Sequence, residues 1–206
     1  MEIDIFENLK IKQRENNLNE LRKEINKSWV TTKIKNHLER NTFLSLSVQD
    51  LKDRIMKDDL LASFFIKDPS KQNFTEIYIA DFLSKIESFK NFKNLASNSN
   101  LFLFNGNIVE KRVNGIKSID YTWDFNDKKV YASQKYIKDN GGAQDNQFND
   151  MITFLENTAL SKEMIFIALI DGAYFNTAKI SVLKKYEKEN VIVCSYIDVE
   201  RRLNEI

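Results

Sequence analysis

Residues 119–137 read IDYTWDFNDKKVYASQKYI, and this stretch decides the expected fold. Two runs rich in β-branched and aromatic side chains, Ile119 to Phe125 and Lys129 to Ile137, flank the polar segment Asn126-Asp127-Lys128. This pattern is typical of a strand, a turn and a second strand. We therefore predict two adjacent strands joined by a turn.

Apolar runs follow on the C-terminal side. Met164 to Ile170 is uninterrupted by polar residues, as in a central strand covered on both faces, and Val191 to Cys194 repeats the pattern. Asp171-Gly172 ends the first run, and Gly141-Gly142 precedes a helical stretch. The helices expected in this half of the chain are residues 143–157, 177–188 and 197–203.

The N-terminal side reads differently. Residues 101–104 and 107–109 flank Asn105-Gly106, which favours a hairpin turn, but the first hundred residues otherwise show helical spacing. One of these helices is expected from about Ser70 to Ile86. The predicted class is α/β, with a central mixed sheet flanked by helices, in a single domain 1–206. It would comprise an α-helical N-terminal region, 1–63, and a core, 64–206.

Composition narrows the classes of function. The net charge is +1, so a polyanionic partner cannot be argued from the whole chain. With one cysteine, Cys194, and one histidine, His37, the chain has no internal disulfide and no Cys/His metal cage, so a metal would need oxygen ligands. No apolar run approaches a membrane span and the first residues lack signal-peptide features, so we expect a cytoplasmic protein without a membrane partner.

Ionisable residues within the predicted sheet are the candidates for chemistry. Ser133 and Lys135 alternate onto one face of their strand, and Asp120 lies on the neighbouring strand. Glu76 lies in line with an apolar helical stripe, which places a carboxylate where a cation is needed to balance it. The simpler alternatives are a cross-strand salt bridge between Asp120 and Lys135, and a structural basic partner for Glu76.

These residues carry a family resemblance. Asp120, Ser133-Gln134-Lys135, the segment 141–147 at a helix start and the strand Phe166 to Gly172 together resemble the core of PD-(D/E)XK type II restriction endonucleases. The segment from Lys67 to Glu76 resembles the first core helix of these enzymes. The resemblance covers about residues 64–204.

The resemblance implies a Mg²⁺-dependent nuclease in which Asp120 binds the metal and Lys135 is the catalytic lysine. Ser133 departs from the family pattern, which expects Asp or Glu there. Some branches have Ser-x-Lys and supply the missing acid from the following helix. Asp145 is the favoured replacement, and Asp150 is the reserve. The catalytic set is then Asp120, Lys135, Ser133, Glu76 and Asp145, with Asp120, Asp145, Glu76 and Gln134 around the metal.

The implied function is sequence-specific cleavage of double-stranded DNA by a homodimer. The alternatives are a structure- or damage-directed nuclease, and a DNA-binding or interaction protein of the same fold that has lost cleavage. Two basic clusters are candidates for contact with phosphates: Lys85, Lys90 and Lys93 interleave with Phe89 and Phe92, and Lys117 borders the hairpin together with Lys111 and Arg112. The simpler alternative is a solvated face of a lysine-rich helix. The candidates for DNA contact are Lys138, Asn140, Gln144, Gln147, Lys111 and Arg112.

Overall fold

The computed structural model describes residues 5–68, 73–95, 100–138 and 142–206. The chain divides into two compact units, Met1–Thr75 and Glu76–Ile206. The single domain expected from the sequence, 1–206 with a helical N-terminal region up to residue 63, stays a prediction. Each unit has its own hydrophobic core.

The first unit is helical, as its spacing predicts. It comprises α1 (Ile5–Lys23), α2 (Ser28–Arg40), α3 (Val48–Ile55) and α4 (Asp59–Ser63). Helix α3 begins with a capping box, in which Ser47 and Asp50 each bond the other's backbone N–H. The fully buried Ile34 and Ile55 belong to the core that these helices share.

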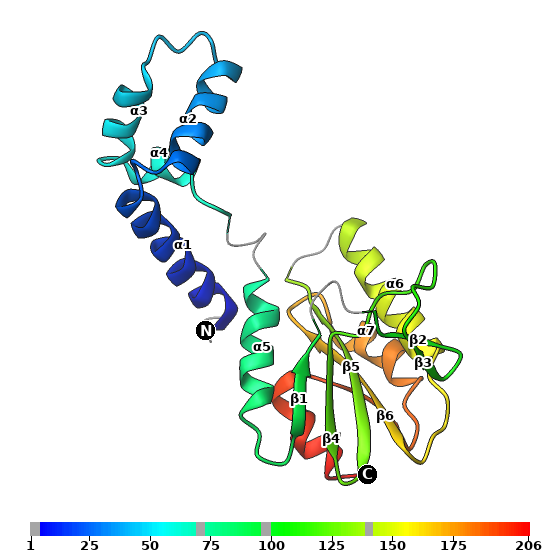
Figure 1. Cartoon of the computed structure of the whole chain (residues 1–206). Coiled ribbons are helices and arrows are strands. Elements are labelled where there is room, and N and C mark those ends of the chain that lie inside the picture. Colours follow the sequence, from blue (N-terminus) through cyan, green and yellow to red (C-terminus); the bar gives the residue numbers. More distant parts are fainter. Residues whose placement is uncertain (1–4, 69–72, 96–99, 139–141) are drawn as a thin grey trace. The chain divides into compact units, whose positions relative to one another are not determined.

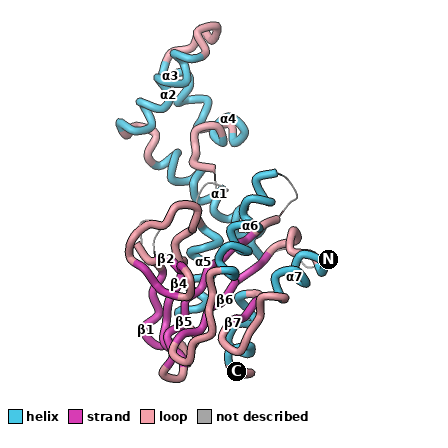
Figure 2. Tube along the Cα trace, turned by 90° about the vertical axis from the view of Figure 1, so that its right-hand side faces the viewer, coloured by secondary structure: helices cyan, strands magenta, loops and turns pink. Residues whose placement is uncertain are grey.

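The second unit is built on a mixed sheet, which confirms the predicted fold class. Five strands lie in the order β1-β4-β5-β6-β7, with β1 and β7 at the edges (Figure 2). β1 and β4, and β4 and β5, pair antiparallel, whereas β5, β6 and β7 run parallel. The strands are β1 (Lys90–Asn94), β4 (Tyr121–Phe125), β5 (Lys128–Tyr136), β6 (Met164–Asp171) and β7 (Val191–Cys194).

Helices cover both faces of this sheet (Figure 1). Side chains of α6 and α7 join Phe166 and Val193 in one buried cluster, while Tyr78 and Phe82 of α5 pack against Tyr196 on the other face. The remaining elements are α5 (Phe74–Ser84), α6 (Gly142–Glu156), α7 (Thr177–Lys184), a 3-10 turn (Tyr196–Asp198) and α8 (Val199–Leu203), with a separate hairpin of β2 (Phe102–Phe104) and β3 (Asn107–Val109).

The predicted strand, turn, strand at residues 119–137 is confirmed. Asn126 and Asp127 have φ of 47° and 60°, so a two-residue turn joins β4 to β5. At the end of β6, Gly172 has φ of 99°, and a Cβ there would lie 2.3 Å from the carbonyl oxygen of Ile137. Only glycine permits this close approach, which fixes the end of β5 just beyond Lys135.

The helical structure expected throughout the first hundred residues is wrong for residues 90–94. Residues 90–94 form the edge strand β1, paired with β4 and interrupted by a bulge where Asn91 has φ of 53°. Phe89 stacks on Trp123 with ring centroids 4.8 Å apart, so this aromatic belongs to the core rather than to a DNA-facing surface. The strand is stabilised by packing against β4, and the spacing of residues within the segment does not indicate such cross-strand contacts.

Candidate active site

The candidate site lies where β4 and β5 separate. Asp120 directly precedes β4, whose first paired residue is Tyr121, while β5 runs on beside β6 alone. Oδ2 of Asp120 accepts hydrogen bonds from the backbone N–H of Gln134, at 2.7 Å, and from Oγ of Ser133, at 3.3 Å. The carboxylate thus replaces the missing backbone partner from β4. Oδ1 accepts no hydrogen bond from any described residue, so it is left for a ligand.

Helix α5 brings a second carboxylate to this strand end. Glu76 lies in the first turn of α5, and its backbone oxygen accepts a hydrogen bond of 3.0 Å from the hydroxyl of Tyr121. Tyr121 is fully buried, so the bond fixes the start of the helix beside the start of β4. Tyr121 was not among the predicted site residues, and only its place next to Asp120 hints at this role.

The charges of Glu76, Asp120 and Lys135 act on one another. Burial raises the pKa of Glu76, the charge of Asp120 raises it further, and Lys135 lowers it. Burial also raises the pKa of Asp120, against the lowering effects of Lys135 and of its two hydrogen bonds. The pKa of Tyr121 is raised by burial and by both carboxylates. Two acids therefore share a desolvated region with one lysine, which leaves negative charge for a further cation to balance.

The donor set fits a hard divalent cation. Mg²⁺ is usually bound through one or two carboxylates and keeps several waters, and both side chains available here are carboxylates. Within the described ranges, no group of three or more His, Cys, Asp or Glu residues comes together. The residues that would hold the ion are Asp120 and Glu76.

The acids of α6 lie in other surroundings. Asp145 is exposed and accepts a hydrogen bond of 2.5 Å from the hydroxyl of Tyr174, whose ring lies 3.9 Å from Nζ of Lys179. Asp150 lies 3.8 Å from Lys117. Neither acid contributes to the raised pKa values of Glu76 and Asp120. The structure therefore brings Glu76 to Asp120, whereas Asp145 ties the start of α6 to the segment before α7.

The predicted DNA-contact residues are mostly accessible. Lys111, Arg112 and Lys138 are exposed, and Gln144 and Gln147 are partly buried on α6. Asn140 lies outside the described residues. His37 is partly buried with its ring edge-on to Phe65, and Cys194 is buried.

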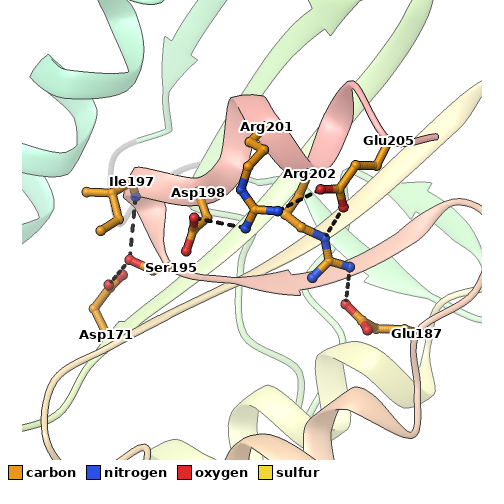
Figure 3. A network of polar contacts seen from close by, with 8 residues as sticks. All are labelled: Asp171, Glu187, Ser195, Ile197, Asp198, Arg201, Arg202 and Glu205. Carbon is orange, nitrogen blue, oxygen red and sulfur yellow. Dashed lines mark hydrogen bonds and ion pairs between the residues drawn. The ribbon is translucent and has the colours of Figure 1, made fainter.

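A second polar network lies at the end of β6 and was missed by sequence reasoning (Figure 3). Asp171 accepts hydrogen bonds from Oγ of Ser195, at 2.5 Å, and from the backbone of Tyr196, at 3.3 Å. Burial raises its pKa to about 7. Nearby, Glu187 pairs with Arg202 at 2.8 Å and accepts the backbone N–H of Val193 on the edge strand β7. Asp171-Gly172 had signalled only the end of a strand.

One comparison with known proteins gave a result. A model of the Tsp45I type II restriction enzyme family matches residues 69–199, a range that contains Glu76, Asp120 and Lys135. Searches of the curated proteins and of the solved structures gave no match. In the part of the chain that the structure describes, no helix has the length and apolar character needed to cross a membrane.

Proposed function

The chain belongs to the Tsp45I type II restriction enzyme family, and we propose that it is a Mg²⁺-dependent endonuclease that hydrolyses both strands of DNA at a specific short sequence. The observation that carries this proposal is the carboxylate of Asp120, held at the strand end by Ser133 and Gln134, together with Glu76, whose pKa is shifted by burial and by the charges of Asp120 and Lys135. A salt bridge alone would not need the second acid.

In this mechanism Asp120 and Glu76 would hold the ion. Ser133 and the backbone N–H of Gln134 donate to Oδ2 of Asp120 and orient its carboxylate, so Oδ1 would be available to the ion. Mg²⁺ bound there would polarise the scissile phosphate and acidify a water molecule. Nζ of Lys135 would orient the attacking water by hydrogen bonding and stabilise the negative charge that grows on the phosphate oxygens.

Ser133 takes the place of the strand acid in this proposal, and Glu76 supplies the second carboxylate. Ser133 is buried and bonded to Asp120, so it serves to orient that aspartate rather than to bind the ion. Asp145, the replacement favoured from sequence, is already bonded to Tyr174. The contribution of the first helix therefore has more support than that of α6.

DNA would be contacted by the segment that leads into Asp120. The hairpin of β2 and β3 is tied to the end of α6, because Asn157 bonds the backbone of Asn105, at 3.1 Å, and of Gly106, at 2.7 Å. Ile119, directly before Asp120, donates to Leu101 at 2.9 Å. Lys111 and Arg112 are exposed between these two anchors, and we propose that they contact DNA phosphates. Lys138, Gln144 and Gln147 are further contacts in this proposal.

A two-fold symmetric site calls for a two-fold symmetric enzyme, so we expect a homodimer that works on DNA in the cytoplasm. The test is incubation with mixed plasmid DNA in Mg²⁺, with EDTA as the matched control. Discrete fragments that appear only with Mg²⁺ would support the proposal. Nicks or smears would favour a structure- or damage-directed nuclease, and intact DNA with a gel shift would favour a binding protein. Fragments that also form in EDTA would contradict the metal site.

A further inference from the structure

Gln134 carries an amide donor with no partner in the described structure. The residue is 9% exposed, and its Nε2 atom is buried without a hydrogen bond. Its backbone N–H donates to Asp120. A buried amide left unpaired costs folding free energy, so its presence calls for a physical reason.

The side chain faces α5 rather than Lys135. Tyr121 and Ala132 are paired across β4 and β5 and therefore share a face, and Gln134, two residues beyond Ala132, continues on that face. The hydroxyl of Tyr121 on the same face bonds the backbone of Glu76. The amide of Gln134 is thus directed to the side of the sheet where the first turn of α5 carries Glu76.

The surroundings would suit an apolar residue. Ala132 on the same strand and Leu169, the partner on β6, are both fully buried. A methionine has similar length and no polar donor, so it would fill this position without an unpaired amide. The glutamine is therefore explained best by an acceptor that becomes available after folding.

We propose that Gln134 is a positioning residue that donates a hydrogen bond from Nε2 to the carboxylate of Glu76 when Glu76 binds the metal. This inference rests on the proposed function. An ionised carboxylate has acceptor sites beyond the one used by a cation, and carboxylates that bind metals are generally held by such outer hydrogen bonds. Gln134 would then bond Asp120 through its backbone and Glu76 through its side chain, and so orient both ligands from one residue.

The test uses the full chain and the variant Gln134→Met. Without metal, its melting temperature should equal that of the parent or exceed it by about 2–4 °C, because an unpaired donor has been removed. The Mg²⁺ concentration that half-saturates the metal-induced rise in melting temperature should increase about 10-fold to 100-fold, and plasmid cleavage at low Mg²⁺ should fall by a similar factor.

Trp123→Phe is the matched control. Nε1 of Trp123 is the other buried donor without a partner on β4 and β5. Trp123 is paired with Val130, away from the site. It should lower the melting temperature and leave the Mg²⁺ requirement unchanged. A parental Mg²⁺ requirement in Gln134→Met would overturn the inference, and so would a lower melting temperature, since the amide would then serve folding. If the parent itself fails to cleave DNA with Mg²⁺, the proposed function is wrong, and so is this inference. If the parent cleaves DNA and Gln134→Met has the same Mg²⁺ requirement as the parent, only this inference is wrong.

Discussion

Asp120 and Asp171 are held by the same kinds of hydrogen bond but lie in different electrostatic surroundings. Each accepts a serine hydroxyl and the backbone N–H of the residue after that serine, Ser133 with Gln134 in one case and Ser195 with Tyr196 in the other. Burial raises the pKa of both aspartates. From these contacts alone, neither could be selected as the functional one.

The neighbouring charges separate them. Asp120 interacts with Lys135 and with a second carboxylate, Glu76. For Asp171, burial raises the pKa most, and among the described residues the charge that contributes is that of Asp198, which raises the pKa further. The arginines near Asp171 are engaged with other acids, since Arg202 pairs with Glu187 and Arg201 with Asp198 (Figure 3). In the proposed site, Asp120 is therefore distinguished from Asp171 by the charges of Glu76 and Lys135 around it, whereas Asp171 is held by hydrogen bonds without an opposite charge.

The largest expected effect is on cleavage by Asp120→Asn. Loss of a metal-binding carboxylate should lower the cleavage rate on the order of 10³-fold or more, because the charge that holds the ion is gone. Asp171→Asn keeps one acceptor oxygen for the backbone N–H of Tyr196, its amide N–H can donate to Oγ of Ser195, and it should cleave within about threefold of the parent. The measurement is the rate of plasmid cleavage in Mg²⁺, taken well below both melting temperatures.

Lys135→Ala extends this test. It should abolish cleavage while keeping most of the DNA affinity, since one lysine among several basic residues is lost. Equal losses of cleavage in Asp120→Asn and Asp171→Asn would contradict the distinction between the two aspartates. Normal turnover in Lys135→Ala would show that Lys135 is not the catalytic lysine.

A smaller but still large effect separates Glu76 from Asp145. Glu76→Gln should reduce cleavage by about 10²-fold and raise the Mg²⁺ requirement, because it removes the carboxylate whose pKa responds to the charge of Asp120. Asp145→Asn should have a much weaker effect, since the contact it changes is with Tyr174. The measurement is the cleavage rate as a function of Mg²⁺ concentration for both variants. If Asp145→Asn were inactive and Glu76→Gln active, the second metal-binding carboxylate would come from α6 and not from α5.

The sequence predicted most of the second unit's architecture because its signals there are local. The Asn126-Asp127 turn and the buried runs of β6 and β7 depend on residues close together in the chain. Strand β1 lacks such a signal. Its sequence, Lys-Asn-Phe-Lys-Asn, is mostly exposed, and it is a strand only because β4 lies beside it.

The candidate site was predictable to a similar extent. Strand alternation and the apolar stripe of α5 identified Asp120, Lys135 and Glu76 as candidates, and the structure brings their charges together. The direction of Asp145 was not predictable, because Tyr174, its partner, lies 29 residues further along the chain. Pairings of this kind depend on how helices pack, which spacing within one helix does not encode.

The smallest expected effect is on the pH dependence of stability. Asp171 has a pKa of about 7 in the folded chain, against an ordinary value of 3.8. Between these values the folded state keeps a proton that the unfolded state has released, so protonation of Asp171 stabilises the fold at acidic pH. This contribution is lost as the pH rises through 7. From pH 5 to pH 8 the loss amounts to about 2–3 kcal/mol, at about 1.4 kcal/mol for each pKa unit.

Asp171→Asn should therefore flatten the decrease in the free energy of unfolding between pH 5 and pH 8, measured by denaturant titration without metal. Asp120 also has a raised pKa, so Asp120→Asn should flatten the same curve. Adding Mg²⁺ to the parent should reproduce the effect of Asp120→Asn but not the effect of Asp171→Asn. The reason is that a cation favours the ionised forms of Asp120 and Glu76 and has no ligand set at Asp171. If Mg²⁺ removed the whole pH dependence of the parent, Asp171 would ionise normally, and the contrast between the two aspartates would rest on Asp120 alone.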